Sequence, residues 1–200
     1  YLIDGIPDGP GEISYTNGES YVGGFSEGVF NGVGTYYYLD GSRFDGIWLE
    51  VDTPGGGVAL SDQIYHMLCK FRDSSKGRFV FVYFKSQACS GGYYISVAAD
   101  KIMAGPAAWT GSIGVIVSSY NLSKLADTLG IKSLNIASSD NKALLDPLKP
   151  VDTNHLAIIQ RVVDQTYDNF LTLVSERRKI PKELLRPIAD GRILSAKDAL

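Results

Sequence analysis

The sequence predicts an α/β domain that follows an all-β extension built of hairpins. Three observations lead to this prediction. The first 48 residues repeat with a period of 23, the remainder alternates strand-type and helix-type patterns, and glycine-rich turns follow two of the predicted strands. Because repeated strand–turn–helix units favour parallel pairing, residues 49–200 should form a sheet with helices packed on it. We therefore expect hairpins over residues 1–48 and a separate α/β domain over residues 49–200.

The repeat consists of glycine and aromatic residues that recur 23 positions apart. The matching pairs are Gly9 and Gly32, Gly11 and Gly34, Tyr15 and Tyr38, Gly18 and Gly41, Tyr21 and Phe44, Gly23 and Gly46, and Phe25 and Trp48. Gly5 also precedes Gly28 by 23 residues, so a partial copy comes before the first full one. Asn-Gly and Asp-Gly dipeptides at 17–18 and 40–41 are typical of tight hairpin turns. Each unit is therefore predicted to be a β-hairpin whose aromatic rings stack on the next unit.

The second part alternates strands and helices. A short strand over 47–52 leads through the turn 54–57 into a helix, where Leu60, Ile64, Met67, Leu68 and Phe71 fall at helical spacing. The apolar run 79–84 predicts a buried strand that ends before a second glycine turn. The remaining predicted elements are strands at 102–104, 115–117 and 133–137, helices at 122–129 and 153–178, and a helix opened by a capping box at Ser195 and Asp198.

The second glycine turn holds a candidate nucleophile. Ser90 is followed by Gly91 and Gly92, and it lies between the predicted strand 79–84 and a helix that opens at Tyr93. Such a turn lifts a serine hydroxyl out of the packed layer and places backbone N–H groups where an oxyanion can form. A purely structural glycine turn has the same appearance, so that alternative stays open.

A serine hydroxyl needs a base before it can attack a carbonyl at neutral pH. Both histidines, His66 and His155, fall inside predicted helices and are interpreted as packing or surface residues. A lysine amine can replace histidine if burial lowers its pKa enough to leave it neutral. Lys142 lies in a loop after a predicted strand and is favoured, although spacing alone does not separate it from Lys132 and Lys149.

The first glycine turn offers groups that could stabilise an oxyanion. Gly56 and Gly57 present backbone N–H groups at a helix start, where the helix dipole favours negative charge. Gly91 would supply another donor beside the nucleophile. A phosphate-binding loop is the rival interpretation, but the Gly-Lys-Ser/Thr sequence that such loops contain is missing.

Composition excludes several other classes. The formal net charge of −3, without an arginine-rich tract, gives no case for nucleic acid as a partner. The two cysteines, Cys69 and Cys89, form neither a disulfide framework nor a metal-binding spacing. We expect no metal and no cofactor. Cys89 is interpreted as a small buried residue rather than a rival nucleophile. Without a run of about 18 apolar residues, any membrane anchor should lie outside this chain.

The glycine and aromatic pattern of residues 1–48 resembles the MORN (membrane occupation and recognition nexus) repeat. The resemblance covers about the first quarter of the chain. It implies a scaffold for protein contact or oligomerisation, with a link to membrane lipids. Short arrays cannot cover their own hydrophobic faces, so the two repeats should lean on the next domain.

Four motifs in residues 47–200 together resemble the signal peptide peptidase A (protease IV) family. They are Asp52-Thr53-Pro54-Gly55-Gly56-Gly57, Ser90-Gly91-Gly92-Tyr93-Tyr94-Ile95-Ser96, Thr110-Gly111-Ser112-Ile113-Gly114-Val115 and Ala189-Asp190-Gly191-Arg192. The resemblance implies the fold shared by Clp protease and crotonase, and a Ser–Lys dyad without a cofactor. It also implies homo-oligomers in the form of rings or domes, and apolar peptide substrates, chiefly signal-peptide remnants at the membrane.

The resemblance also implies roles for individual residues. Ser90 corresponds to the nucleophile, and Lys142, 52 residues downstream, fits the general base. Ser112 fits a hydroxyl that orients the lysine, while Gly56, Gly57 and Gly91 would supply the oxyanion hole. Two other functions remain open: a catalytically inactive protease-like scaffold whose repeats bind protein or lipid, and an acyl-CoA enzyme of the crotonase type, against which the Ser90–Lys142 pairing argues.

Overall fold

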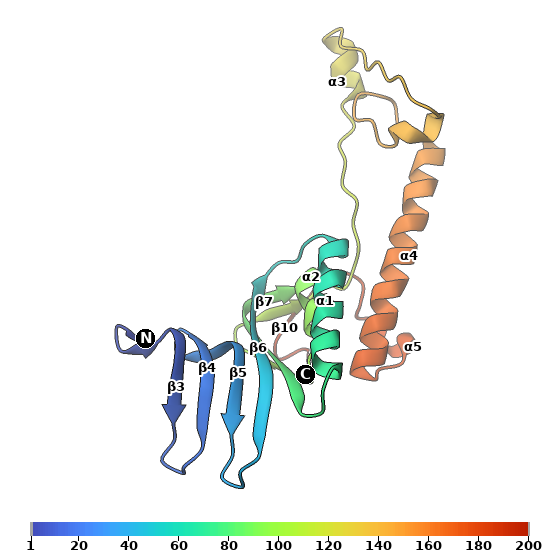
Figure 1. Cartoon of the computed structure of the whole chain (residues 1–200). Helices are drawn as coiled ribbons and strands as arrows, with labels where there is room; N and C mark the ends of the chain where they lie inside the picture. Colours follow the sequence, from blue (N-terminus) through green and yellow to red (C-terminus); the bar gives the residue numbers. More distant parts are fainter. Residues whose placement is uncertain (1, 200) are drawn as a thin grey trace. The chain divides into compact units, whose positions relative to one another are not determined.

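The computed structural model describes residues 2–199, which form two compact units (Figure 1). Of the described residues, the first unit comprises 2–113 and 171–199, and the second comprises 114–170. The strands are β1 (Leu2–Ile3), β2 (Ile6–Pro7), β3 (Gly9–Ser14), β4 (Ser20–Ser26), β5 (Val29–Tyr37), β6 (Arg43–Thr53), β7 (Arg78–Cys89), β8 (Lys101–Ala104), β9 (Trp109–Gly111) and β10 (Ile193–Ser195). The helices are α1 (Val58–Asp73), α2 (Gly91–Ser96), α3 (Ser123–Thr128), the 3₁₀ helix η1 (Asp140–Ala143), α4 (Thr153–Arg178) and α5 (Lys182–Leu185).

In the first unit β1 and β2 form a small sheet of their own, and the other strands form one sheet in the order β10-β9-β7-β6-β5-β4-β3, with β8 paired to β7 (Figure 1 labels β3 to β7 and β10). The strands from β3 to β6 pair antiparallel, whereas β7 pairs parallel with β6, β8 and β9. Strand β6 therefore belongs both to the last hairpin and to the parallel half. The predicted α/β class with an N-terminal hairpin extension is confirmed. The domain boundary near residue 48 falls inside β6 and stays a prediction.

The period of 23 also appears in the backbone conformation. Asp4 and Gly5 have φ angles of 50° and 80°, and Glu27 and Gly28, 23 residues later, have 49° and 84°. The pairs Leu2↔Pro7 and Ile3↔Ile6 of β1–β2 likewise precede Phe25↔Phe30 and Ser26↔Val29 of β4–β5 by 23 residues. Residues 2–7 thus adopt the same turn as the full repeat, as the partial copy predicts.

Aromatic rings form the core of the hairpin region. Tyr21 is fully buried, lies stacked on Phe30 with ring centroids 3.7 Å apart, and meets Phe25 and Trp48 edge-on. A Cβ atom on Gly34 would lie only 2.3 Å from the Tyr21 hydroxyl oxygen, so this position needs glycine to admit the ring. Burial raises the pKa of Tyr21 to about 12. The glycines and aromatic residues therefore recur together because the rings fill the space that the missing glycine side chains leave.

Tyr21→Ala should lower the free energy of unfolding by about 3–5 kcal/mol, because it leaves a large cavity in this aromatic stack. Urea titration followed by tryptophan fluorescence would measure the loss. Tyr37→Ala is the matched control, since Tyr37 is 41% exposed and its removal should cost less than about 1 kcal/mol. Equal losses in the two variants would contradict the assignment of Tyr21 to the core.

The parallel half has its own core, formed where helices cover one face of the sheet. Val80 and Val82 of β7 are fully buried, as are Leu171 and Val174 near the end of α4. Arg177 of α4 donates hydrogen bonds to the hydroxyl of Tyr65 and to Sγ of Cys69, both on α1. The buried face of α1 consists of Ser61, Tyr65, Leu68 and Cys69, so Leu60, Ile64 and Met67 remain exposed despite their helical spacing.

The second unit contains α3, η1 and the first part of α4, joined by long extended segments. The predicted helices at 122–129 and 153–178 are confirmed. The predicted strands at 115–117 and 133–137 are wrong, because within residues 2–199 these segments have no strand beside them to complete a ladder. The helix predicted from Ser195 is also wrong. Ser195 and Asp198 make the expected capping contacts, but Ser195 ends β10, which pairs with β9.

None of the helices in the described part of the chain combines the length and apolar composition needed to cross a membrane.

Candidate active site

Ser90 occupies a strained turn between β7 and α2. Its φ and ψ angles are 49° and −116°, a combination that residues other than glycine rarely adopt. Two hydrogen bonds of 2.9 Å hold it there: the Ser90 N–H donates to the Gly111 carbonyl, and the Tyr94 N–H donates to the Ser90 carbonyl. This is the strand-to-helix geometry in which hydrolases display a nucleophilic serine. The predicted glycine-flanked turn is therefore present, with the serine at its apex.

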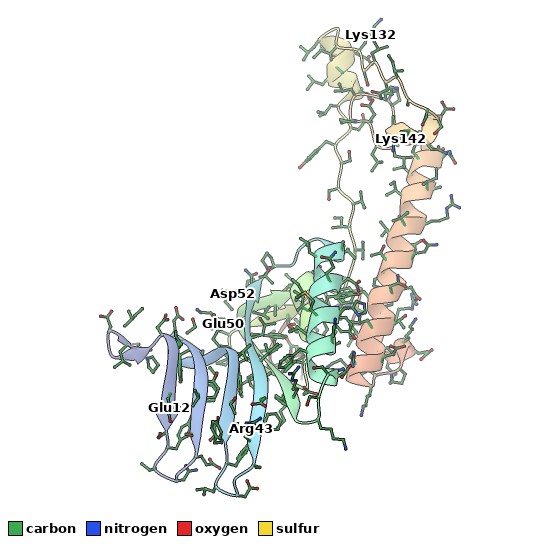
Figure 2. All side chains as sticks on the ribbon, in the orientation of Figure 1. Glu12, Arg43, Glu50, Asp52, Lys132 and Lys142 are labelled. Carbon is green, nitrogen blue, oxygen red and sulfur yellow. The ribbon has the colours of Figure 1, made fainter. Side chains whose placement is uncertain are left out.

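The first glycine turn lies directly against this serine. It follows the end of β6, where Figure 2 labels Asp52. A Cβ atom on Gly55 would lie 2.8 Å from Cβ of Ser90 and 3.3 Å from the backbone nitrogen of Gly91. A Cβ atom on Gly91 would lie 3.0 Å from the backbone nitrogen of Gly56. The two turns can approach this closely because both contact positions are glycines.

Unused backbone donors gather at this contact. Within residues 2–199, the N–H groups of Gly56, Gly57 and Gly91 donate to no protein acceptor. Gly57 caps the N-terminus of α1, so the partial positive charge of that helix adds to the local field. Free N–H groups beside a serine hydroxyl are the arrangement that stabilises an oxyanion. The structure thus places two of the three glycines predicted for the oxyanion hole, Gly91 and Gly56, at the Ser90 turn, and Gly57 follows Gly56 in the chain.

Ser112 directly follows the end of β9, just as Ser90 directly follows the end of β7. Cys89 pairs with Gly111 in the parallel ladder between β7 and β9, so the two serines follow paired residues. Neighbouring strands are about 5 Å apart, which places the two turns side by side. Ser112 also has a positive φ, 51°, and its N–H donates to the Arg192 carbonyl at 2.7 Å. The predicted orienting serine is therefore adjacent to the predicted nucleophile.

The turn at 189–192 supports Ser112 from the other side. The carboxylate of Asp190 accepts hydrogen bonds from the backbone N–H and the guanidinium of Arg192. These contacts lower the pKa of Asp190 to about 2. They close the turn that presents the Arg192 carbonyl to Ser112. The Ala-Asp-Gly-Arg motif therefore forms the turn that contacts Ser112.

The predicted base lies in the other unit. Lys142 is part of η1, its side chain is exposed, and Figure 2 labels it together with Lys132 on the second unit. Lys149, the other alternative, also belongs to the second unit. Lys85 of the first unit is engaged, because its amine lies 2.7 Å from a carboxylate oxygen of Glu27 and 3.3 Å from one of Glu50.

Two residues that the sequence interpretation missed support the glycine turn. The hydroxyl oxygen of Thr53 lies 3.1 Å from the Gly55 carbonyl oxygen and 3.2 Å from the Gly55 nitrogen. The hydroxyl of buried Ser61 donates to the Gly57 carbonyl at 3.2 Å. A threonine two residues before a glycine in a turn is a known signal for such a side-chain bond, and it could have identified Thr53.

The remaining candidates lie away from this contact or are unsuited to it. His66 is exposed on α1 beside Asp62. Cys89 is buried, and burial raises the pKa of its thiol, which disfavours the reactive thiolate. Within residues 2–199, no cluster of three His, Cys, Asp or Glu side chains could hold a metal ion.

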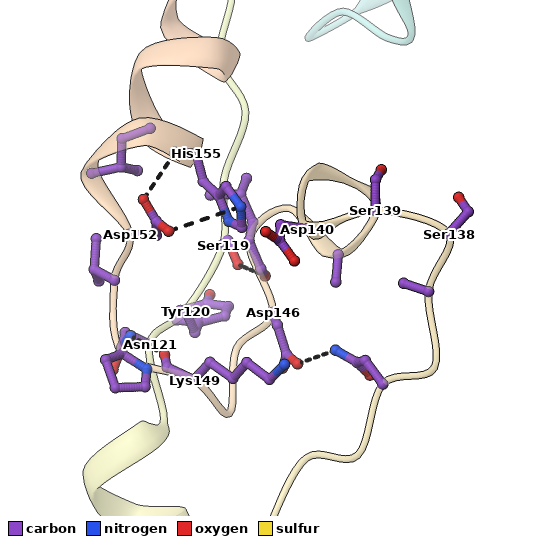
Figure 3. A pocket seen from close by; sticks show the side chains of 17 residues that line it. Ser119, Tyr120, Asn121, Ser138, Ser139, Asp140, Asp146, Lys149, Asp152 and His155 are labelled. Carbon is purple, nitrogen blue, oxygen red and sulfur yellow. Dashed lines mark hydrogen bonds and ion pairs between the residues drawn. The ribbon is translucent and has the colours of Figure 1, made fainter.

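A cavity of about 720 Å³ lies within the second unit (Figure 3). His155 and Asp152 face each other at its wall, with 4.0 Å between Nε2 and Oδ2. Asp146 is engaged by Ser133 and Asn135, and these hydrogen bonds lower its pKa. Asp146 therefore links the segment that carries Ser133 and Asn135 to its own loop.

Known proteins resemble this chain in both its peptidase-like region and its hairpin repeats. The sequence model of Peptidase family S49 matches residues 72–200, and that of the MORN repeat matches residues 2–20 and 21–43. A signal peptide peptidase, SppA by name, of Enterococcus faecium is 36% identical over 155 residues, covering 78% of this chain and 44% of its own. Protease 4 of Salmonella typhi is 30% identical over 191 residues, covering 94% of this chain and 30% of its own.

Among solved structures, a ClpP1 mutant from Listeria monocytogenes matches with a TM-score of 0.47 and 16% identity, covering 77% of this chain and 67% of its own. The chain spans less than half the length of the two relatives named above. The S49 match covers more than half of the chain, and it contains the strained serine turn. This chain therefore belongs to peptidase family S49 and carries MORN repeats before its peptidase region.

Proposed function

We propose that the chain carries the catalytic part of a serine endopeptidase with Ser90 as the nucleophile. The observation that carries this proposal is the strained conformation of Ser90 directly beside the unused N–H groups of Gly56 and Gly91. A strained backbone costs about 1–3 kcal/mol and persists where the surroundings hold it, often at active sites. Membership of family S49 supports peptide bonds as the substrate.

In the proposed reaction the Ser90 hydroxyl oxygen attacks the carbonyl carbon of the scissile peptide bond while its proton passes to the base. The carbonyl oxygen becomes an oxyanion that accepts hydrogen bonds from Gly56 and Gly91, with Gly57 next to them. Collapse of this intermediate breaks the C–N bond, and the base returns the proton to the departing amine. Water then attacks the ester on Ser90 with the help of the same base, which releases the second product.

Lys142 is the proposed base, and Ser112 the hydroxyl that orients it. Within residues 2–199, Lys142 forms no ion pair with an acidic group, whereas Lys85 is bound by two carboxylates. Lys132 and Lys149 are the alternatives. The Ser–Lys dyad could form within one chain or between two copies, and a test for each case is given in the Discussion.

The proposed substrates are apolar peptides such as signal-peptide remnants, since one relative is named as a signal peptide peptidase. Membrane association and self-association into a homo-oligomer are part of the same proposal. The hairpins would contribute to those contacts. Neither nucleic acid nor a cofactor has a role in it.

A second candidate function is a protease-like scaffold that binds protein or lipid without turnover. This scaffold function is favoured by exposed apolar side chains on the hairpin strands, which a bound protein or lipid could cover. Val22, Val33 and Tyr37 are 42%, 69% and 41% exposed. The scaffold function predicts binding in the absence of any covalent chemistry at Ser90. Reactivity of that serine therefore separates the two candidates.

Incubation of the chain with a fluorophosphonate probe, followed by peptide mass spectrometry, tests the proposal. We expect one adduct, located on Ser90, because the probe places its oxygen in the oxyanion hole. Denatured chain is the control and should remain unlabelled, since the arrangement depends on the fold. A folded sample without an adduct at Ser90 would favour the scaffold over the peptidase.

A further inference from the structure

We propose that Thr53 is a positioning residue whose hydroxyl holds the Gly55–Gly56 peptide in the orientation that presents the Gly56 N–H to the oxyanion. This inference rests on the proposed peptidase function and adds a residue to its site. Thr53 is the last residue of β6 and lies two positions before Gly55. It does not touch the reacting atoms itself, and it acts through the backbone of the turn.

The Thr53 hydroxyl makes two contacts with the same glycine. It donates to the Gly55 carbonyl oxygen at 3.1 Å and accepts from the Gly55 N–H at 3.2 Å. One side chain thereby ties both ends of Gly55 to the end of the strand. The N–H···O distance lies at the upper end of the ordinary range and the O–H···O distance slightly exceeds its range, so both hydrogen bonds are long.

Fixing the carbonyl of Gly55 also fixes the N–H of Gly56. The two groups belong to one planar trans peptide unit, in which C=O and N–H point in opposite directions. With the Gly55 oxygen held toward Thr53, the Gly56 N–H must point away from Thr53. The Gly56 nitrogen is the atom that lies 3.0 Å from a Cβ placed on Gly91, beside Ser90. In the held orientation the Gly56 N–H therefore points away from Thr53, and its nitrogen lies beside Gly91, the residue that follows Ser90.

Glycines on both sides make this peptide easy to rotate. Gly55 has a φ of +131°, and neither Gly55 nor Gly56 has a Cβ atom that would oppose a flip. The strand ladder gives little help, because Val51 pairs with Phe84 but Thr53 pairs with Ala88, so the register is interrupted here. A side-chain hydrogen bond is thus the contact best placed to select one of the two orientations.

The methyl group of Thr53 is also anchored. A Cβ atom on Gly92 would lie 2.7 Å from Cγ2 of Thr53, so the methyl packs against the first turn of α2. This contact links Thr53 to the helix that follows Ser90. Serine would keep the hydroxyl and lose this packing, whereas valine would keep the packing and lose the hydroxyl.

These two substitutions in the full chain form the test. With an apolar tripeptidyl-aminomethylcoumarin as substrate, Thr53→Val should lower kcat about tenfold, the factor that corresponds to one hydrogen bond. KM should stay unchanged, because the Gly56 N–H acts on the oxyanion rather than on the bound ground state. Thr53→Ser should stay within about twofold of the parent chain. Thr35→Val removes a hydroxyl bonded to Asp45 in the hairpins and should leave kcat unchanged.

A second readout keeps the inference separate from the proposed function. Crystal structures of the parent chain and the Thr53→Val variant would show directly whether the Gly55–Gly56 peptide has turned over. A parent chain without hydrolysis or Ser90 labelling would refute the peptidase, and the peptide orientation would still decide the role of Thr53. Full kcat in Thr53→Val, or an unchanged peptide orientation, would overturn the inference. Loss of activity in Thr53→Ser equal to that in Thr53→Val would point to packing instead.

Discussion

Ser90→Gly is expected to reduce peptide hydrolysis by at least about 10³-fold, because the acyl-enzyme cannot form without the serine oxygen. Glycine is the preferred replacement at this position. It adopts the φ of 49° without strain, so the turn and the fold should be retained. Ser90→Ala should lose the same activity and keep about the parent's stability, because serine and alanine both carry the Cβ atom that this φ disfavours, whereas Ser90→Gly should be the more stable variant. Initial rates with the tripeptidyl substrate, together with urea titrations, would separate the two effects.

Cys89→Ala is the control for this loss. Cys89 is the immediate neighbour of Ser90, is buried, and has a thiol whose pKa is raised by burial. Its replacement should leave the rate within about threefold of the parent chain. Full activity in Ser90→Gly would refute the assignment of the nucleophile. Inactivity in Cys89→Ala alone would transfer that role to the cysteine.

Lys142→Met should bring a loss of similar size, at least about 10²-fold in kcat, because the serine then lacks a group to accept its proton. Methionine preserves the length of the side chain and removes the amine. Lys132→Met and Lys149→Met are matched controls, since both lysines lie in the same unit, and each should stay within about threefold of the parent. A loss confined to one of these two variants would identify that lysine as the base.

Mixing the two inactive variants tests whether the dyad crosses between copies. If Lys142 of one copy serves Ser90 of another, Ser90→Gly and Lys142→Met chains that assemble together should recover a fraction of the parent activity. If the dyad forms within one chain, the mixture should stay as inactive as its components. The assembled state of the mixture, followed by light scattering, shows that the copies have combined.

Much of the candidate site could be predicted from local sequence. Tight turns require glycine at particular positions, so the turns at Gly55–Gly57 and around Ser90 can be recognised from glycine clusters in the sequence. The 23-residue repeat likewise predicted the hairpins, because the buried ring of Tyr21 requires glycines at fixed positions across the strands. Both patterns arise from contacts that the residue types themselves dictate.

Other features had no local pattern of that kind. The segments 115–117 and 133–137 have strand-type sequences, yet a strand exists only where a neighbouring strand completes its hydrogen bonds. Helical spacing placed Leu60, Ile64 and Met67 on one stripe of α1, but only the packing of that helix decided that the adjacent stripe is buried. The support from Thr53 was overlooked because a hydroxyl near a glycine is common, and its value depends on which peptide it holds.

By itself the sequence determined the repeat, the α/β class, the family resemblance and the residue types gathered in two glycine turns. Tertiary structure alone decided that both turns touch, that Ser112 lies beside Ser90, and that one continuous sheet joins the hairpins to the parallel strands. The physical reason is the separation in sequence between the residues that make each contact. Turn signals come from neighbouring residues and the repeat from contacts within one hairpin unit or with the next, whereas contacts between Gly55 and Ser90 or between β9 and β10 depend on how distant segments pack.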